Sequence, residues 1–214
     1  MDTLTVSEIF LSIQGEGTRA GLPCTLIRLT GCNLRCAWCD TRHAYEGGRQ
    51  MSVADVLARV GELGCPLVEV TGGEPLAQPH ATLLLRALCD AGYETLLETN
   101  GSLDVRGVDG RVVRIVDFKC PSSGQADRNL WANVDCLRPG DEVKFVVADR
   151  ADYDFARQAV ERHRLAEQCT VLLSPVLDRL APAELAGWIL TDGLGVRLSL
   201  QLHRILWPDA QRGV

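Results

Sequence analysis

The sequence has no run of apolar residues that approaches a membrane span, and no basic segment followed by an apolar core near its amino terminus. We therefore expect neither a membrane anchor nor a secretory leader.

Positive charge is also scarce, since 22 lysines and arginines stand against 28 aspartates and glutamates and the formal net charge is −6. This balance gives no electrostatic footprint for nucleic acid. Pro/Ser-rich linkers, low-complexity tracts and repeats are missing as well. The sequence predicts one cytoplasmic domain over residues 1–214.

The cysteines lack the even number of a disulfide framework, because there are nine of them in 214 residues, and a chain of this length has enough core to fold without disulfides. Three of the nine, Cys32, Cys36 and Cys39, are spaced C-x3-C-x2-C with no fourth cysteine or histidine beside them. Three thiolates can hold three irons of a [4Fe–4S] cube and leave the fourth iron open. An open iron can bind and act on a small molecule, so the spacing predicts chemistry at the cluster.

Two other interpretations of this segment remain. Cys65 could close a four-cysteine zinc site or cluster, but it lies in Leu63-Gly64-Cys65-Pro66 beyond a predicted helix and would need an unusually long reach. The three cysteines could also be ordinary buried thiols, although glycine, asparagine and arginine beside them do not suggest a core segment. Most of the other six cysteines are expected to be inert core residues: Cys24, Cys65, Cys89, Cys120, Cys136 and Cys169.

Apolar, β-branched runs alternate with amphipathic segments, which is typical of an α/β fold with a parallel sheet and right-handed crossovers. Strands are predicted at Thr25 to Thr30, Leu67 to Thr71, Thr95 to Thr99, Val112 to Phe118, Glu142 to Val147, Thr170 to Leu173 and Val196 to Leu200. Helices are predicted near Ser52 to Leu63, Ala81 to Ala91, Tyr153 to His163 and Pro182 to Leu190. Ser52 and Asp152 are the expected N-caps of the first and third helices.

Polar motifs follow directly on the ends of most predicted strands. They are Thr30-Gly31-Cys32, Thr71-Gly72-Gly73-Glu74-Pro75, Glu98-Thr99-Asn100-Gly101, Asp117-Phe118-Lys119-Cys120-Pro121, Ser174-Pro175 and Gln201-Leu202-His203. Because the carboxyl ends of parallel strands meet at one rim, we expect these motifs to form one site. The connections after Thr99 and Pro121 are too short or irregular for full helices. The sequence therefore predicts an incomplete, TIM-like parallel barrel.

The Gly72-Gly73-Glu74 segment is the second strong signal, because two glycines let a ligand approach the backbone and Glu74 offers a carboxylate at the rim. Gly-Gly also marks tight turns anywhere. Some thirty residues after a C-x3-C-x2-C loop, however, the segment resembles the radical S-adenosylmethionine superfamily. In that superfamily S-adenosylmethionine chelates the open iron, and the Gly-Gly-Glu segment receives its amino group.

Further similarity narrows the resemblance to the 7-carboxy-7-deazaguanine synthases of queuosine precursor biosynthesis. It lies in Phe10-Leu11-Ser12-Ile13-Gln14-Gly15-Glu16-Gly17, Gly21, Pro23, Arg28-Leu29-Thr30-Gly31-Cys32-Asn33-Leu34, Trp38-Cys39-Asp40-Thr41, Glu98-Thr99-Asn100-Gly101, Asp117, Lys119, Pro121, Lys144-Phe145-Val146 and Gln201-Leu202-His203-Arg204. The chain departs from the family at Leu202-His203-Arg204, where Thr-His-Lys is common, and at Leu26, where Phe is common.

The resemblance implies a radical-mediated lyase that converts 6-carboxy-5,6,7,8-tetrahydropterin to 7-carboxy-7-deazaguanine with release of ammonia. Its cofactors would be a [4Fe–4S] cluster, S-adenosylmethionine and Mg²⁺. S-adenosylmethionine would be regenerated in each turnover. A flavodoxin- or ferredoxin-type reductant and a homodimer are also implied, with no nucleic acid and no membrane as partners.

Several residues are assigned roles on this basis. Arg28, Glu16 and His203 are expected to be catalytic, and the substrate would bind to Ile13, Gln14, Gly15, Glu16, Arg28, Thr71 and His203. S-adenosylmethionine would bind to Trp38, Cys39, Gly73, Glu74, Ser122, Ser174 and Gln201. Cys32, Cys36 and Cys39 would hold the cluster, and Thr41 would hold Mg²⁺.

Physical chemistry supports some of these roles. A pterin carboxylate needs a cation, and Arg28 offers a planar fork of donors; its plainer interpretation is a surface salt bridge. Gln14, Gly15 and Glu16 can present amide, backbone and carboxylate groups to a pyrimidine edge. Trp38 could shield the cluster or stack on adenine. Two other functions stay open: an activase of glycyl-radical enzymes, which would need a protein-docking surface, and a non-catalytic iron or zinc sensor.

Overall fold

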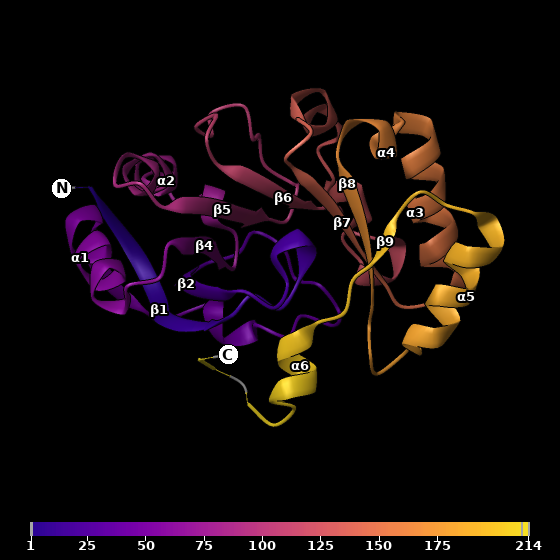
Figure 1. Ribbon diagram of the computed structural model, residues 1–214, viewed down its shortest axis with the longest axis horizontal. Coiled ribbons are helices and arrows are strands. Elements are labelled where there is room, and N and C mark those ends of the chain that lie inside the picture. The colour runs from indigo at the N-terminus through magenta and orange to yellow at the C-terminus, as the bar shows by residue number, and fades with distance from the viewer. Residues whose placement is uncertain (1, 211, 214) are drawn as a thin grey trace.

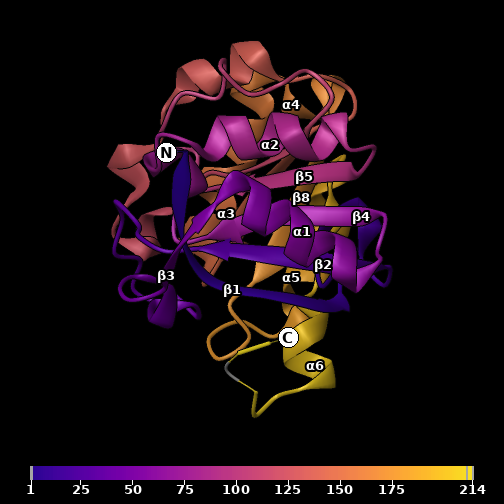
Figure 2. The ribbon, with the colours of Figure 1, turned by 90° about the vertical axis from the view of Figure 1, so that its left-hand side faces the viewer.

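A nine-stranded sheet forms the frame of the molecule in the computed structural model, which describes residues 2–210 and 212–213. The strand order is β3-β1-β2-β4-β5-β6-β7-β8-β9. All neighbours from β2 to β9 are parallel, whereas β1 is antiparallel to both β2 and β3. Because β3 and β9 lie at opposite ends of this order, the sheet is an unclosed, partial barrel, as expected. Strand β9 is labelled in Figure 1, and β3 is labelled in Figure 2.

The strands are β1 (Thr3–Ile13), β2 (Pro23–Leu29), β3 (Arg49–Ser52), β4 (Leu67–Gly72), β5 (Glu94–Thr99), β6 (Val113–Asp117), β7 (Glu142–Val147), β8 (Thr170–Pro175) and β9 (Arg197–Leu198). The helices are α1 (Val53–Leu63), α2 (Ala81–Asp90), α3 (Arg150–His163), α4 (Leu165–Gln168), α5 (Pro182–Asp192) and α6 (Leu202–Leu206). Helices α1 and α2 lie beside the first strands, and α3, α4 and α5 lie beside the last (Figure 1).

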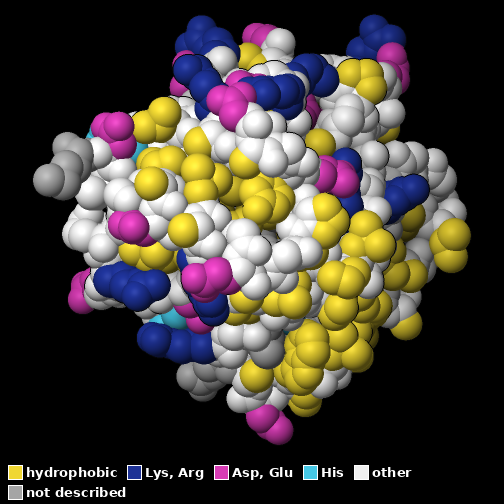
Figure 3. Space-filling view, turned by 60° about the vertical axis from the view of Figure 1, so that its left-hand side comes forward, with side chains coloured by type: hydrophobic (Ala, Val, Ile, Leu, Met, Phe, Trp, Pro, Cys, Tyr) yellow, Lys and Arg dark blue, Asp and Glu magenta, His cyan; other side chains and the backbone are white. Residues whose placement is uncertain are grey.

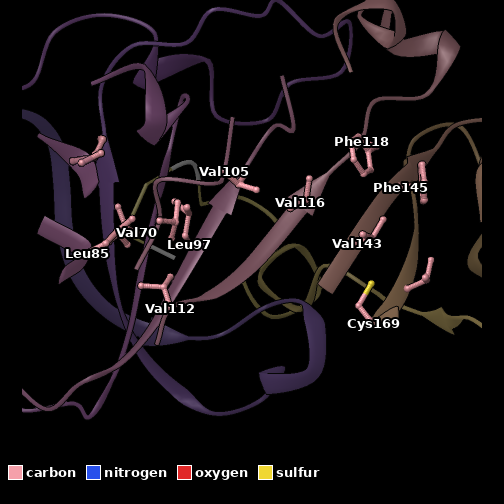
Figure 4. Close-up of a cluster of buried hydrophobic side chains, with 14 of the residues drawn as sticks. Val70, Leu85, Leu97, Val105, Val112, Val116, Phe118, Val143, Phe145 and Cys169 are labelled. Carbon is pink, nitrogen blue, oxygen red and sulfur yellow. The ribbon is translucent and has the colours of Figure 1, made fainter. Parts of the chain in front are cut away.

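Alternation along each strand separates a packed outer face from the inner face that carries the site. On β4, Val68 and Val70 point to the main core between sheet and helices, whereas Leu67, Glu69 and Thr71 point inward. Figure 4 shows that main core, with side chains from successive strands in one band. A second apolar cluster, built by Cys24, Leu26, Cys65, Leu67, Leu96 and Ile115, lies on the inner face. Polar groups of the inner face are therefore held over an apolar floor.

Helix boundaries follow capping chemistry. Ser52 caps α1 as predicted and forms a reciprocal capping box with Asp55. The predicted cap of α3 is wrong: Asp149 is the N-cap and accepts a hydrogen bond from the Asp152 backbone N–H. Asp152 lies in the first turn, and its buried carboxylate accepts hydrogen bonds from Ala148 and Ser122.

All seven predicted strands and four predicted helices are present, within three residues at each end. The sequence reasoning missed β1, β3, α4 and α6. Strand β1 is half-buried and carries a register shift between Val6 and Glu8, which blurs its alternation. The antiparallel β1 also means that the sheet is not wholly parallel.

Two crossovers lack a full helix, as expected for an incomplete barrel. Residues 100–112 join β5 to β6 without a helix, and the link from β6 to β7 has only 3-10 turns. In residues 2–210 and 212–213, no helix is both long and apolar enough to cross a bilayer.

Candidate active site

One cavity of about 550 Å³ opens at the carboxyl ends of the strands and gathers most of the predicted residues. Its walls come from the segment after β1, the cysteine loop after β2, the inner faces of β4 to β7 and the carboxyl-terminal segment. The predicted site residues that line it are Ile13, Gln14, Gly15, Glu16, Arg28, Cys32, Cys36, Trp38, Cys39, Thr41, Thr71, Gly73, Gln201 and His203. The expected single rim is therefore present.

The three motif cysteines are partly exposed to this cavity. Cys32 Sγ receives the backbone N–H of Leu34 at 3.4 Å and the Asn100 side-chain amide at 3.8 Å. Three thiols, with no fourth cysteine among the described residues that line the cavity, suit an open cluster, and N–H donors to a sulfur stabilise thiolate ligands. Across the described residues, no three histidine, cysteine or acidic side chains form a group that could hold a single metal ion. Three thiols on one loop are the donor set that a cluster with one open iron needs.

Cys65 lies in a different environment from the three motif cysteines. It is buried in the second apolar cluster, its Sγ lies 3.3 Å from the Pro23 carbonyl oxygen, and it does not line the cavity. A four-cysteine site that uses Cys65 is therefore wrong. Cys24, Cys120 and Cys169 are also buried, whereas Cys89 and Cys136 are partly exposed.

Gly72 and Gly73 allow two segments of backbone to pack closely against each other. A Cβ on Gly72 would collide with the Leu29 carbonyl oxygen, and a Cβ on Gly73 would collide with the Gly31 carbonyl oxygen and Cys32. Gly72 also has a φ of 137°, which L side chains rarely adopt. The end of β4 therefore lies directly against the start of the cysteine loop and fixes its position.

Three predicted cofactor residues lie near the carboxyl ends of strands but do not line the cavity. Glu74 is fully buried, and its carboxylate accepts hydrogen bonds from Leu76, Thr99 and the Asn100 backbone. The Ser122 hydroxyl donates to Asp152. The Ser174 hydroxyl is fully buried and has no hydrogen-bond partner among the described residues. None of the three lines the cavity. Glu74 and Ser122 bond instead to neighbouring backbone and side chains, and Ser174 is buried within β8.

A charged network forms one wall of the cavity. The chain has only two lysines, and both are in this wall. Lys144 Nζ lies 3.0 Å from Glu16 and 3.7 Å from Asp117, and it also contacts Glu98. Burial alone would lower the pKa of Lys144, but Glu16 and Glu98 raise it well above its ordinary value. Lys119 lies 2.8 Å from Asp117, which likewise raises its pKa against the effect of burial. Both lysines are charged.

Arg28 is paired within the protein. Its Nε donates to Glu8 Oε1 at 2.7 Å, and His43 lies 3.2 Å from the same oxygen. Burial raises the pKa of Glu8, but Arg28 and His43 more than reverse this, so the net shift is downward. Because Arg28 also lines the cavity, one of its faces is available to a bound anion.

The carboxyl-terminal segment connects the two sides of the cavity. Gln201 Nε2 donates to Glu16 at 3.0 Å and to Asp40 at 3.4 Å, and His203 lies 3.9 Å from Asp40. The Thr41 hydroxyl donates to Asp40 at 2.8 Å. Gln201, predicted beside S-adenosylmethionine, therefore bridges the predicted substrate group Glu16 and the cysteine loop.

The sequence reasoning assigned no role to Glu69, Glu98, Asp117, Lys119 and Lys144, although all five line the cavity. The sequence does contain a signal for these residues. A charged residue at an inward position of an otherwise apolar strand, such as Lys144 in Glu-Val-Lys-Phe-Val-Val, has to be paired with an opposite charge.

Comparisons with family models, with curated proteins and with solved structures all point to the same family. A model described as the radical SAM superfamily matches residues 26–117. A 7-carboxy-7-deazaguanine synthase from Koribacter versatilis is 42% identical over 99% of this chain and 100% of its own length. One from Chlorobaculum tepidum is 46% identical over 99% of this chain and 97% of its own length. The crystal structure of QueE from Escherichia coli aligns with a TM-score of 0.79 and 25% identity, covering 94% of this chain and 95% of that one.

Proposed function

Because this chain belongs to the 7-carboxy-7-deazaguanine synthase family of radical S-adenosylmethionine enzymes, we propose that its cavity is the site of that family's reaction. The protein converts 6-carboxy-5,6,7,8-tetrahydropterin to 7-carboxy-7-deazaguanine in queuosine precursor biosynthesis, and the two compounds differ by one ammonia. The observation that carries this proposal is the shared cavity: three thiols, with no fourth cysteine among the described residues that line it, face the same space as a network of paired charges.

We propose that Cys32, Cys36 and Cys39 hold a [4Fe–4S] cluster whose open iron binds S-adenosylmethionine. When bound, this pair supplies a carbon-centred radical that takes a hydrogen atom from the substrate. The protein's own residues bind, orient and exclude water. Trp38, Gly73 and Gln201 line the cavity near the cysteine loop and would contact S-adenosylmethionine, with Cys39 adjacent. Glu74 and Ser122 would act on it only indirectly, by holding the loops, and Ser174 would act through its place near the carboxyl end of β8.

The opposite side of the cavity suits the pterin. Glu16 is oriented by Lys144 and Gln201, and its carboxylate can accept N–H groups from the pyrimidine ring. Ile13, Gly15, Thr71 and His203 complete this side. His203 lies against Gly15, where a Cβ would come within 2.8 Å of the ring Nδ1. This contact requires a residue without a side chain at position 15.

Arg28 is expected to bind the substrate carboxylate, and Arg28→Ala tests this. Removing one partner of a desolvated charged pair costs about 2–5 kcal/mol, so substrate affinity should fall by far more than tenfold. Equilibrium binding of the carboxypterin under anaerobic conditions measures the effect.

Glu8→Gln is the matched control for Arg28→Ala, because it removes the charge of the resident partner of Arg28 and leaves the guanidinium in place. We expect Glu8→Gln to bind substrate at least as tightly as wild type. If Arg28→Ala binds within twofold of wild type, Arg28 does not contact the substrate.

We also propose a Mg²⁺ site at Thr41. A neutral hydroxyl alone is a poor ligand, since Mg²⁺ prefers octahedral oxygen coordination with one or two carboxylates and several waters. Asp40 supplies an anionic oxygen within 2.8 Å of the Thr41 hydroxyl, and the substrate's carboxylate and ring oxygen would add others. Mg²⁺ should then bind weakly alone and tightly with substrate, and each should raise the affinity of the other by the same factor.

Thr41→Val is expected to lose most of its response to Mg²⁺ and still cleave S-adenosylmethionine. Titration of Mg²⁺ into wild type and variant, with and without substrate, measures this. Equal activation of both proteins by Mg²⁺ would remove Thr41 from the ion.

Other parts of the proposal concern the setting of the enzyme. A flavodoxin- or ferredoxin-type protein would supply the electron, and residues 1–214 would work as one domain built on one sheet.

A homodimer is supported by large apolar side chains that are exposed, among them Leu190, Ile205 and Leu206. Figure 3 shows hydrophobic side chains gathered in the lower right of one face. The cytoplasm, where thiols stay reduced, is the proposed location.

Reconstitution separates this proposal from its alternatives. With iron, sulfide and dithionite under anaerobic conditions, the protein is expected to cleave S-adenosylmethionine slowly without any protein partner. A metal sensor would leave S-adenosylmethionine intact, and an activase would require its target protein for turnover.

A further inference from the structure

Glu69 is a buried carboxyl of the cavity to which the proposed function assigns no task. It is in the middle of β4, opposite Leu26 of β2 and Leu96 of β5. Both leucines belong to the second apolar cluster. The residue is only 3% exposed, yet it lines the cavity. Glu69 therefore lies where the apolar floor meets the polar space above it.

The carboxyl is tied to Gln14. Its Oε2 accepts a hydrogen bond from Gln14 Nε2, and Gln14 Oε1 accepts the backbone N–H of Glu16 at 3.2 Å. Within residues 2–210 and 212–213, the Glu69 carboxyl has no second hydrogen-bond partner. The amide of Gln14 is thus fixed at both ends, and the Glu69 carboxyl keeps hydrogen-bonding capacity for a ligand.

Charged and titratable groups face Glu69 from several elements. They are Glu98 on β5, Glu16 after β1, Lys144 on β7 and Cys24 on β2. Lys144 is already shared among Glu16, Glu98 and Asp117, and Lys119 pairs with Asp117. If Glu69 were ionised, neither lysine of this wall would be left to pair with it alone.

The proton state of Glu69 follows from this setting. Burial and the nearby charge of Glu98 raise the pKa of Glu69 to about 8, although Gln14 and Lys144 act in the opposite direction. For Glu98, burial would raise the pKa, but Lys144 lowers it to about 2. At neutral pH, Glu69 holds a proton while Glu98 is ionised.

A neutral carboxyl presents one O–H donor and one carbonyl acceptor side by side. This pair complements an amino group next to an unprotonated ring nitrogen, which is the edge formed by the 2-amino group and N1 of a pterin. An ionised carboxylate offers acceptors only and would face the lone pair of that nitrogen. Glu16 and Gln14 remain available for the other edge of the pyrimidine ring.

We propose that the neutral carboxyl of Glu69 is a specificity-determining group that recognises the 2-amino group and adjacent ring nitrogen of the pterin, an inference that rests on the proposed function. Glu69→Gln keeps one donor and one acceptor without a titrating proton. Glu69→Leu removes both and matches the apolar floor in character.

The test is anaerobic equilibrium binding of 6-carboxy-5,6,7,8-tetrahydropterin, without reductant, on both sides of a pKa of about 8. Wild type is expected to lose affinity as the pH rises through this value, by up to about tenfold per pH unit above it. Glu69→Gln should bind within about threefold of wild type at neutral pH and show no such fall. Glu69→Leu should bind more than about tenfold more weakly at every pH.

Stability provides a separate readout. Between the ordinary pKa of 4.5 and about 8, the folded state holds more protons at Glu69 than the unfolded state. The contribution of this group to stability therefore falls as the pH rises across that window. Glu69→Gln should flatten the fall, whereas Glu62→Gln on the exposed face of α1 should leave both stability and binding unchanged.

The outcomes separate the two proposals. If wild type neither binds nor converts the carboxypterin, the proposed function fails. If wild type converts it, but Glu69→Leu binds it within threefold or Glu69→Gln keeps the wild-type pH profile, only the role of Glu69 is wrong. The pH profile of Glu69→Gln decides the matter even if Glu69→Leu does not fold.

Discussion

Alanine at Cys32, Cys36 or Cys39 is expected to abolish the brown colour of the reconstituted protein, its bound iron and sulfide, and its activity. In the proposed assignment each thiol is one of three cluster ligands, and a cube held by two thiolates would leave two irons exposed to solvent. Folding should persist, because all three side chains are partly exposed and contribute little to the core. Iron and sulfide content per chain, visible absorbance and circular dichroism measure these effects.

Cys65→Ala is the matched control for the cluster ligands. Cys65 belongs to the second apolar cluster and bonds the Pro23 carbonyl, so its loss should lower stability modestly and leave iron content unchanged. Loss of iron from folded Cys65→Ala, or retention of a full cluster by a folded Cys36→Ala, would overturn the ligand assignment.

Lys144→Met is expected to destabilise the protein and to remove most activity. The side chain is 5% exposed and is the shared cation of Glu16, Glu98 and Asp117. Removing one partner from a buried ion pair costs about 3–5 kcal/mol. Because the Glu16 and Glu98 side chains keep 18% and 27% exposure, we expect a loss near the lower end of that range, or a Tm lower by on the order of 10 °C.

The pH dependence of Lys144→Met identifies the cause of the loss. In wild type, Lys144 lowers the pKa of Glu98, so this ionised pair stabilises the fold at neutral pH and the benefit is lost only in strong acid. In the variant the pKa of Glu98 should rise. The penalty should then be greatest at neutral pH and shrink as the pH falls toward the ordinary range of a carboxyl.

Arg59→Met on α1 is the control for Lys144→Met, since it removes a cation from an exposed pair with Glu62. Its free energy of unfolding should change by no more than about 0.5 kcal/mol. A Tm for Lys144→Met equal to that of Arg59→Met would show that the network does not depend on Lys144.

The parts of the fold that could be predicted from the sequence depend on strong local patterns. The strand at Glu142 to Val147 has the predicted bounds, and Ser52 caps α1 because a serine followed by Asp55 satisfies both exposed backbone donors. The expectation of an unclosed barrel followed from connections too short for helices, and it is confirmed. Strand β1 was missed because eight of its eleven residues are only partly buried and its alternation is interrupted.

The candidate site could be predicted where a residue type is chemically unusual in its place. The cysteine loop and Gln14-Gly15-Glu16 line the cavity as expected. Glu74 shows the limit of this reasoning, because its carboxylate is fully engaged in holding Asn100 and Leu76. Which of two polar partners a carboxylate contacts depends on distances across the sheet, and these do not follow from spacing along the chain.

Turnover of 6-carboxy-5,6,7,8-tetrahydropterin by the reconstituted protein under anaerobic conditions is the decisive test of the proposed activity. With S-adenosylmethionine, dithionite and Mg²⁺, we expect 7-carboxy-7-deazaguanine and ammonia in equal amounts, with no product from Cys36→Ala. A fully reconstituted wild-type protein that cleaves S-adenosylmethionine but forms neither the deazaguanine nor ammonia would show that the cavity does not carry out this reaction.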